Sequence, residues 1–251
     1  MQNIYDNKKF FDEYIKMRDG EINANNLIEK PMFRALMPKL QGKRVLDLGC
    51  GYGDLCVYAI ENGAIKAVGT DISKKMIELA KEKNSNKIIE YIIKPMEKID
   101  DLDEKFDVIL SSLAFHYVED YAKLIKDISN LLKPNGVLLF SQEHPMVTAM
   151  TQPQNGKKID KKLDLEGKRY YLVSDYNNVG KRVITWNVDG VIKYHRNMET
   201  VLNTLIDNGL KIERIEESKA LEQAIKLEPK YVNQKDRPMF LFVRARKDRQ
   251  Y

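Results

Sequence analysis

The residues best suited to chemistry are an acid and three alternating glycines, Asp47, Gly49, Gly51 and Gly53, at the end of a short apolar run. Glycine allows a loop to turn sharply, and it lets the backbone approach a ligand that a Cβ atom would exclude. The segment after the loop reads as a helix, whose first N–H groups are free to donate hydrogen bonds. A strand, a glycine loop and a helix in this order predict a cradle for a nucleotide-sized ligand.

A second acid, Asp71, ends the next predicted strand. A carboxylate there can accept hydrogen bonds from both ribose hydroxyls of an adenosine, and Ile72 beside it can pack on the adenine. The glycine spacing argues against a dinucleotide, because Gly-x-Gly-x-x-Gly from Gly49 needs glycine or alanine where the chain has Asp54. A nicotinamide oxidoreductase is therefore disfavoured.

These groups need a framework that brings strand ends together. Short apolar runs alternate with helical periodicities, which predicts a parallel sheet covered by helices. Ser73 and Asp120 are the expected N-caps of two of these helices, and Pro134 to Gly136 is expected to end the second. The first five strands are predicted at residues 44–48, 67–70, 88–93, 106–111 and 137–141.

The alternation of strand and helix patterns stops at Gln142, where we predict an inserted antiparallel ribbon over residues 142–197. Its strands are expected at 170–173, 182–188 and 191–195, and Asp189-Gly190 is the expected hairpin turn. Afterwards we expect a helix at 198–206, a strand at 210–215, a helix at 221–225 and a last strand at 239–244.

Composition narrows the class of protein. The 251 residues suit a single domain, 1–251, with a helical N-terminal arm at 1–40. A net charge of +5 without a basic stripe makes nucleic acid an unfavoured partner. The two cysteines, Cys50 and Cys56, form neither a disulfide framework nor a zinc motif, so we expect no metal and a reducing cytoplasm. No apolar run approaches the ~20 residues of a membrane span, and a monomer or homodimer is expected.

The combined motifs resemble the class I S-adenosylmethionine-dependent methyltransferases. The resemblance covers residues 43–141 and 198–246, and it includes Asp-x-Gly-x-Gly-x-Gly from Asp47, the segments at 106–116 and 132–138, and the closing run at 237–243. It implies an α/β, Rossmann-like seven-stranded sheet of order 3-2-1-4-5-7-6, mostly parallel with an antiparallel last strand. S-adenosyl-L-methionine would be the cofactor, S-adenosyl-L-homocysteine the product and a small molecule the methyl acceptor, as in similar bacterial enzymes.

The resemblance also implies the cofactor contacts. The loop would face the methionine part of the cofactor. Asp47 would hold the loop, or hold the methionine ammonium group through water, or else serve only as a structural turn acid. Arg18, one helical turn after Tyr14, would pair with the methionine carboxylate, or else lie solvated on the surface. Pro95 stands where an acid usually contacts adenine, so that contact would pass to Met96 or Glu97. The full cofactor set is Tyr14, Arg18, Asp47, Gly49, Cys50, Gly51, Gly53, Asp71, Ile72, Met76, Met96, Glu97 and Ser111.

All three histidines fall where the sheet edge or the insertion would place them. We rank His144 first as a general base, His116 second and His195 third, and each has a purely structural alternative. The insertion could also supply an aromatic acceptor pocket, or its rings could simply pack the ribbon onto the domain. Those rings are Tyr170, Tyr171, Tyr176, Trp186 and Tyr194.

Two motifs of nucleic-acid methyltransferases are absent from the sequence. Amino-directed nucleic-acid enzymes usually carry Asn/Asp-Pro-Pro-Tyr after the fourth strand, where this chain has Ser111 to Ala114. The cytosine C5 type needs a Pro-Cys nucleophile, and neither cysteine follows proline. The alternatives left open are a methyltransferase acting on RNA or protein and a non-catalytic module that binds S-adenosylmethionine.

Overall fold

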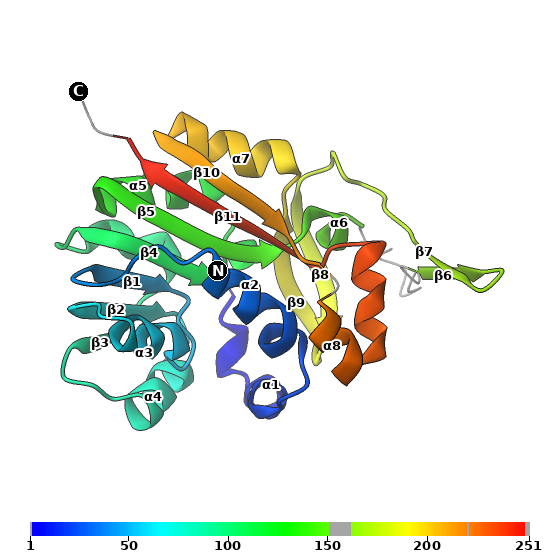
Figure 1. Ribbon diagram of the computed structural model, residues 1–251, viewed down its shortest axis with the longest axis horizontal. Coiled ribbons are helices and arrows are strands. Elements are labelled where there is room, and N and C mark those ends of the chain that lie inside the picture. The colour runs from blue at the N-terminus through cyan, green and yellow to red at the C-terminus, as the bar shows by residue number, and fades with distance from the viewer. Residues whose placement is uncertain (1, 151–161, 220, 249–251) are drawn as a thin grey trace.

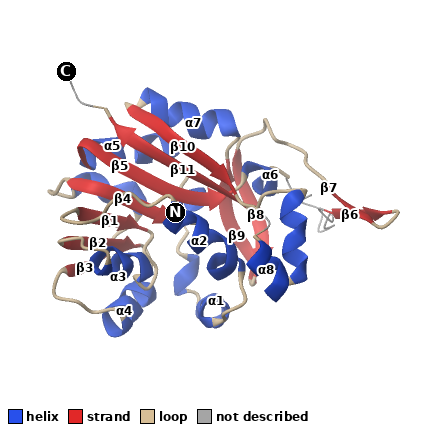
Figure 2. Cartoon of the chain, viewed as in Figure 1, coloured by secondary structure: helices blue, strands red, loops and turns tan. Residues whose placement is uncertain are grey.

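A seven-stranded sheet forms the centre of the computed structural model, which describes residues 2–150, 162–219 and 221–248 (Figures 1 and 2). Its strand order is β3-β2-β1-β4-β5-β11-β10. Strands β1 to β5 run parallel, and β11 is antiparallel to both β5 and β10. The predicted order 3-2-1-4-5-7-6 is therefore confirmed. The strands are β1 Arg44–Leu48, β2 Lys66–Asp71, β3 Ile89–Ile93, β4 Phe106–Ser112, β5 Leu132–Glu143, β10 Leu210–Glu217 and β11 Phe240–Lys247.

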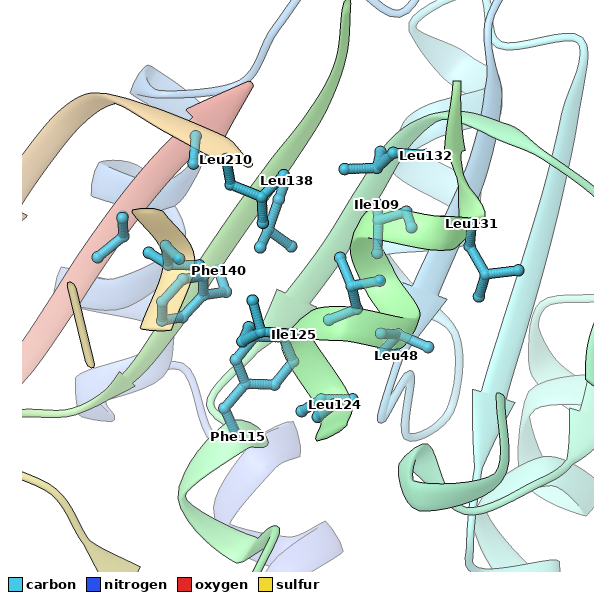
Figure 3. Close-up of a cluster of buried hydrophobic side chains, with 14 of the residues drawn as sticks. Leu48, Ile109, Phe115, Leu124, Ile125, Leu131, Leu132, Leu138, Phe140 and Leu210 are labelled. Atoms are coloured by element: carbon cyan, nitrogen blue, oxygen red, sulfur yellow. The ribbon is translucent and has the colours of Figure 1, made fainter. Parts of the chain in front are cut away.

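Helices cover both faces of the sheet. Because both faces of each inner strand are buried, consecutive residues along these strands are apolar. On one face, α5 and α7 pack over a large cluster that includes Ile109, Ile125 and Phe140 (Figure 3). On the other face, α2, α3 and α8 surround Val45, Leu110 and their neighbours. The helices are α2 Lys30–Ala35, α3 Asp54–Glu61, α4 Lys74–Lys83, α5 Tyr121–Leu131, α7 Met198–Asp207 and α8 Glu222–Leu227.

Both predicted N-caps are confirmed. The Ser73 side chain accepts a hydrogen bond from the Met76 amide at 3.1 Å, and Asp120 accepts from the Lys123 amide at 2.9 Å. The predicted end of α5 is wrong, since the helix stops at Leu131 and the segment from Leu132 already belongs to β5. A residue before proline is disfavoured in the helical region, so the chain turns extended ahead of Pro134.

The insertion contains two antiparallel hairpins, β6–β7 and β8–β9. The predicted turn at Asp189-Gly190 is wrong. Trp186 pairs with Val188 across Asn187, and Asp189-Gly190 lies inside β9 at a register shift, where Gly190 supplies a φ of 80°. The hairpins consist of β6 Lys162–Leu165, β7 Lys168–Tyr171, β8 Gly180–Trp186 and β9 Val188–His195.

Strand β6, the partner of β7, was not predicted. The β6–β7 hairpin projects away from the sheet (Figure 1). Residues 151–161 of the predicted insertion and residues 249–251 lie outside the described residues. Short α6, Pro145–Thr148, connects β5 with the rest of the insertion.

The N-terminal arm consists of the short turn Ile4–Asp6, helix α1 at Lys8–Asp19 and a π-helical turn, Asn25–Glu29, that runs into α2. The Gln2 side chain joins this arm to β9, because it donates to the Gly190 carbonyl at 2.8 Å and accepts from the Ile192 amide at 2.9 Å. The arm and the β8–β9 ribbon therefore meet across the carboxyl edge of the sheet (Figure 1). Within the described ranges, the helices are all too short or too polar to cross a membrane.

Candidate functional site

A cavity of about 320 Å³ lies at the carboxyl edge of the parallel strands, beneath the arm and the β8–β9 ribbon. Small-molecule sites typically measure about 300 to 1,000 Å³ and occupy this edge in open α/β sheets. Most of the predicted cofactor residues line it. They are Tyr14, Arg18, Asp47, Gly49, Cys50, Gly51, Asp71, Ile72, Met76, Met96 and Glu97.

Two of the predicted cofactor residues do not line the cavity. The Ser111 side chain is fully buried and donates to the Leu48 carbonyl at 2.8 Å, whereas its neighbour Ser112 faces the cavity. Gly53 is the N-cap of α3, and a Cβ there would meet the Tyr91 ring at 2.3 to 2.7 Å. Gly53 therefore shapes the loop from behind.

The loop glycines serve two purposes. At Gly49, with a φ of 69°, a Cβ would lie 2.6 Å from the Cβ of Ala114, so glycine allows the β1 and β4 loops to touch. At Gly51, with a φ of 54°, a Cβ would meet nothing within 4 Å. The backbone at Gly51 therefore faces open space, and its N–H donates to Asp71 Oδ2 at 2.9 Å.

Asp47 is 1% exposed, and its Oδ1 atom has no hydrogen-bond partner among the residues that the structure describes. Burial, followed by the negative charges of Asp71 and Asp54, raises the pKa of Asp47 to about 8. A positive group beside Oδ1 would relieve both the missing hydrogen bond and the repulsion. The site therefore fits a ligand that carries a cation at this point, as the methionine ammonium would.

Asp71 is held by two backbone donors, the Ser73 amide at 2.8 Å to Oδ1 and the Gly51 amide at 2.9 Å to Oδ2. Burial outweighs these donors and raises its pKa to about 6. Each carboxylate oxygen keeps a further lone pair. Two adjacent hydroxyls of a ribose match that arrangement, and Ile72 and Met76 supply apolar surface beside it.

The chain can be placed among known proteins on this basis. Residues 39–180 match the family model described as a methyltransferase domain. The chain belongs to this methyltransferase family. It is 40% identical over 255 residues to an uncharacterized protein of Haemophilus influenzae, an alignment covering 97% of this chain and 96% of that protein. A ubiquinone biosynthesis O-methyltransferase of Pelagibacter ubique is 39% identical over 119 residues, 46% of this chain and 48% of that protein.

Among solved structures, an S-adenosylmethionine-dependent methyltransferase of Mesorhizobium loti superposes with a TM-score of 0.80 and 37% identity. The superposition covers 90% of this chain and 98% of that one. The methyltransferase described above is therefore an enzyme that uses S-adenosylmethionine, as the resemblance of its combined motifs implied. Its methyl acceptor is a separate question.

Arg18 faces the cavity of the methyltransferase from α1. Its side chain is 12% exposed, which excludes the solvated alternative, and Nη2 lies 3.5 Å from Asp54 Oδ2. Lys30 contacts the same oxygen at 2.8 Å. The buried Nε atom of Arg18 has no hydrogen-bond partner in the described ranges, so Arg18 retains a donor for an anionic group.

The three histidines separate in space. His144 caps α6, since its Nδ1 accepts from the Met146 amide at 3.1 Å while Nε2 contacts Glu217 at 2.8 Å. His195 is fully buried between Thr148 and the Tyr176 carbonyl, at 2.8 and 3.0 Å. Neither lines the cavity of the methyltransferase, so the ranking of His144 first and His195 third is not retained.

His116 does line the cavity, but it is a poor base. Burial lowers its pKa to about 3, so the ring is neutral at physiological pH. The Glu143 amide donates to Nδ1 at 3.4 Å, which leaves the ring proton on Nε2. His116 is therefore suited to donating a hydrogen bond through Nε2.

Several residues that line the cavity were not predicted from the sequence. Glu29, 1% exposed, accepts hydrogen bonds at Oε1 from Ser141 at 2.6 Å and Ser112 at 2.8 Å, and burial raises its pKa. It lies in a polar helical segment, where nothing in the sequence distinguishes it from a surface residue. Of the five insertion aromatics only Trp186 lines the cavity, joined there by Tyr5, Tyr117, Glu143 and Lys193.

Proposed function

We propose that this methyltransferase moves the methyl group of S-adenosylmethionine to an oxygen, nitrogen or carbon atom of a small molecule by in-line displacement. The cofactor supplies an activated methyl group, so the protein mainly has to align the acceptor and exclude water. Alignment of this kind can contribute about 7 to 11 kcal/mol to lowering the barrier.

The observation that carries the proposal is the contact between the arm and the β8–β9 ribbon, which together form a roof over part of the cavity. Gln2 bonds the arm to β9, and Phe10 and Tyr14 pack against Trp186 with ring centroids 5.3 and 6.2 Å apart. A small molecule can be enclosed beneath such a roof. An RNA or a protein segment would first have to separate the arm from the ribbon, which makes polymer acceptors the weaker candidate.

In this proposal, different residues of the chain bind different parts of the cofactor. Asp47 receives the methionine ammonium group, and Arg18 pairs with the carboxylate, since each has an unused buried polar atom. Asp71 accepts from the ribose hydroxyls. The adenine lies between Ile72 and the Met96-Glu97 segment, and Tyr14 closes over the cofactor. Cys50 in the glycine loop and Met76 on α4 complete the lining.

Calorimetry with S-adenosylhomocysteine and with NAD tests the cofactor assignment. We expect S-adenosylhomocysteine to bind and NAD not to bind; the reverse result would sink the proposal. Asp71→Ala should abolish the binding of S-adenosylhomocysteine.

A methyl-transfer screen with labelled S-adenosylmethionine tests the acceptor class. We expect label in the low-molecular-weight fraction of a metabolite extract and none with Asp71→Ala. Label that appears only in RNA or protein would show that the acceptor is a polymer and would contradict the proposed small-molecule acceptor. Cofactor binding without any labelled product would favour the non-catalytic module.

A further inference from the structure

We propose that the end of the cavity beside Lys193 is the acceptor site, and that the acceptor is a flat aromatic molecule carrying a carboxylate or similar oxygen anion. This inference rests on the proposed function and deepens it, because it names the chemical class that the methyltransferase accepts. It is carried by an under-satisfied ammonium group among aromatic rings.

Lys193 reaches the cavity from β9, and its side chain is 5% exposed. An ammonium group has three N–H donors. Among the residues that the structure describes, its single hydrogen bond runs to Glu143 Oε1 at 2.6 Å. A buried donor without an acceptor is costly, so the two remaining N–H groups are suited to ligand oxygens.

Aromatic rings surround this ammonium group. Lys193 Nζ lies 4.7 Å from the centre of the Trp186 ring and 5.7 Å from that of Tyr117. Tyr5 stands edge-on to Tyr117, with their hydroxyls 3.3 Å apart, and Tyr14 stands at 90° to Trp186. Walls of this kind favour a flat ring, which can stack on one face and meet the edge of another.

The polar groups at this end decide the sign of the ligand's charge. The Glu143 carboxylate already has Lys193 as its ion partner, and the positive charge of Arg237 also acts on it. His116 adds a neutral donor at Nε2. An amine would be repelled by the Lys193 ammonium and would find the nearest carboxylate already paired, whereas an oxygen anion would meet donors.

A matched set of small probes tests this assignment on the full-length protein loaded with S-adenosylhomocysteine. Benzoate, benzyl alcohol and benzylamine share one ring and differ in charge. Ligand-observed NMR titration into the millimolar range should rank benzoate at least about tenfold tighter than benzyl alcohol, because a hydrogen bond to a charged group is worth about a factor of ten or more. Benzylamine should bind most weakly.

Variants locate the effect. Lys193→Met should reduce benzoate binding at least about tenfold without changing benzyl alcohol, and Lys193→Arg should retain it. Because Lys193→Met removes the ion pair between Lys193 and Glu143, the double variant with Glu143→Gln provides a second test, and it too should lose benzoate. Lys181→Met, an exposed lysine on the neighbouring strand β8, is the matched control and should bind benzoate normally.

The contrary outcomes are distinct. Benzylamine binding as tightly as benzoate, benzoate binding unchanged by Lys193→Met, or no probe binding at all would overturn the inference. Failure of S-adenosylhomocysteine to bind, measured beforehand by calorimetry, would count against the proposed function instead. The ranking of the three probes on the unmodified protein applies even if a variant does not fold.

Discussion

Replacing Asp47 with asparagine should make the free protein more stable and its cofactor site weaker. Burial, followed by the negative charges of Asp71 and Asp54, raises the pKa of Asp47 to about 8 from 3.8. Asparagine keeps the shape of the side chain and can keep an oxygen toward Cys56, whose Sγ lies 3.9 Å from Oδ2. With its pKa raised to about 8, the Asp47 carboxyl is mostly protonated at pH 7 in the folded protein, and asparagine removes the cost of that protonation.

The magnitude follows from the size of the pKa shift. A group whose pKa is higher in the folded than in the unfolded protein costs nothing below the unfolded value. Its cost to stability grows as the pH rises and is complete above the folded value. For Asp47 this window runs from about pH 4 to about pH 8. At about 1.4 kcal/mol per pH unit, the cost at pH 7 has an upper limit of about 4 kcal/mol.

Thermal unfolding at pH 7 and pH 4.5 measures this effect. We expect Asp47→Asn to gain about 1 to 4 kcal/mol at pH 7, where each kcal/mol moves the Tm of a chain this size by about 2 to 4 °C. The gain should shrink at pH 4.5. Calorimetry should show S-adenosylhomocysteine binding weakened by roughly 10- to 150-fold, the loss of one hydrogen bond between charged groups.

The matched control is Asp54→Asn, at the first residue of α3. Asp54 contacts Lys30 and Arg18, so its replacement should bring no stabilisation. A lower Tm for Asp47→Asn at pH 7, or unaltered binding of S-adenosylhomocysteine, would refute the assignment of Asp47 as an uncompensated acid that awaits a cation.

Three further changes are expected to act locally. Adenosine affinity should rise between pH 5 and pH 7, because Asp71, whose pKa is raised to about 6, accepts hydrogen bonds best when ionised; titration calorimetry that finds no slope, or an equal slope in Asp71→Asn, would count against its role. His144→Ala should lower stability by about 1 to 3 kcal/mol through the lost cap and the Glu217 contact, while S-adenosylhomocysteine affinity stays unchanged; weaker binding would return His144 to the site. Gly49→Ala should lower both stability and cofactor affinity, since its Cβ would lie 2.6 Å from that of Ala114. Denaturant unfolding measures the stability and calorimetry measures the affinity; an unchanged value of either would contradict this prediction.

Local patterns carried much of the fold. The apolar runs predicted the seven strands of the main sheet. The caps Ser73 and Asp120 each accept from a backbone amide three residues further on, so the sequence alone identifies them. The failed hairpin turn at Asp189-Gly190 has a local cause as well. A glycine that permits positive φ suits a bulge as well as a turn, and here Asp189 instead accepts from the Thr185 hydroxyl at 2.6 Å.

The cavity was predictable only on its cofactor side. Asp47 and Asp71 end neighbouring strands, so their meeting follows from sheet order. Glu29 contacts Ser141 across 112 positions, and Lys193 contacts Glu143 across 50, which no local pattern encodes. His144 shows the opposite error, because a residue just beyond a strand can turn toward the cavity or cap the next helix, and the sequence does not distinguish the two.

The bonds between Gln2 and β9 also bear on how the chain is made. Gln2 and Gly190 lie 188 positions apart. The arm therefore leaves the ribosome well before β9. Until then Tyr5, Phe10 and Tyr14 lack the Trp186 surface that covers them. The aromatic contact that joins the arm to the β8–β9 ribbon is therefore completed late in synthesis, after the strands that carry Asp47 and Asp71 have been made.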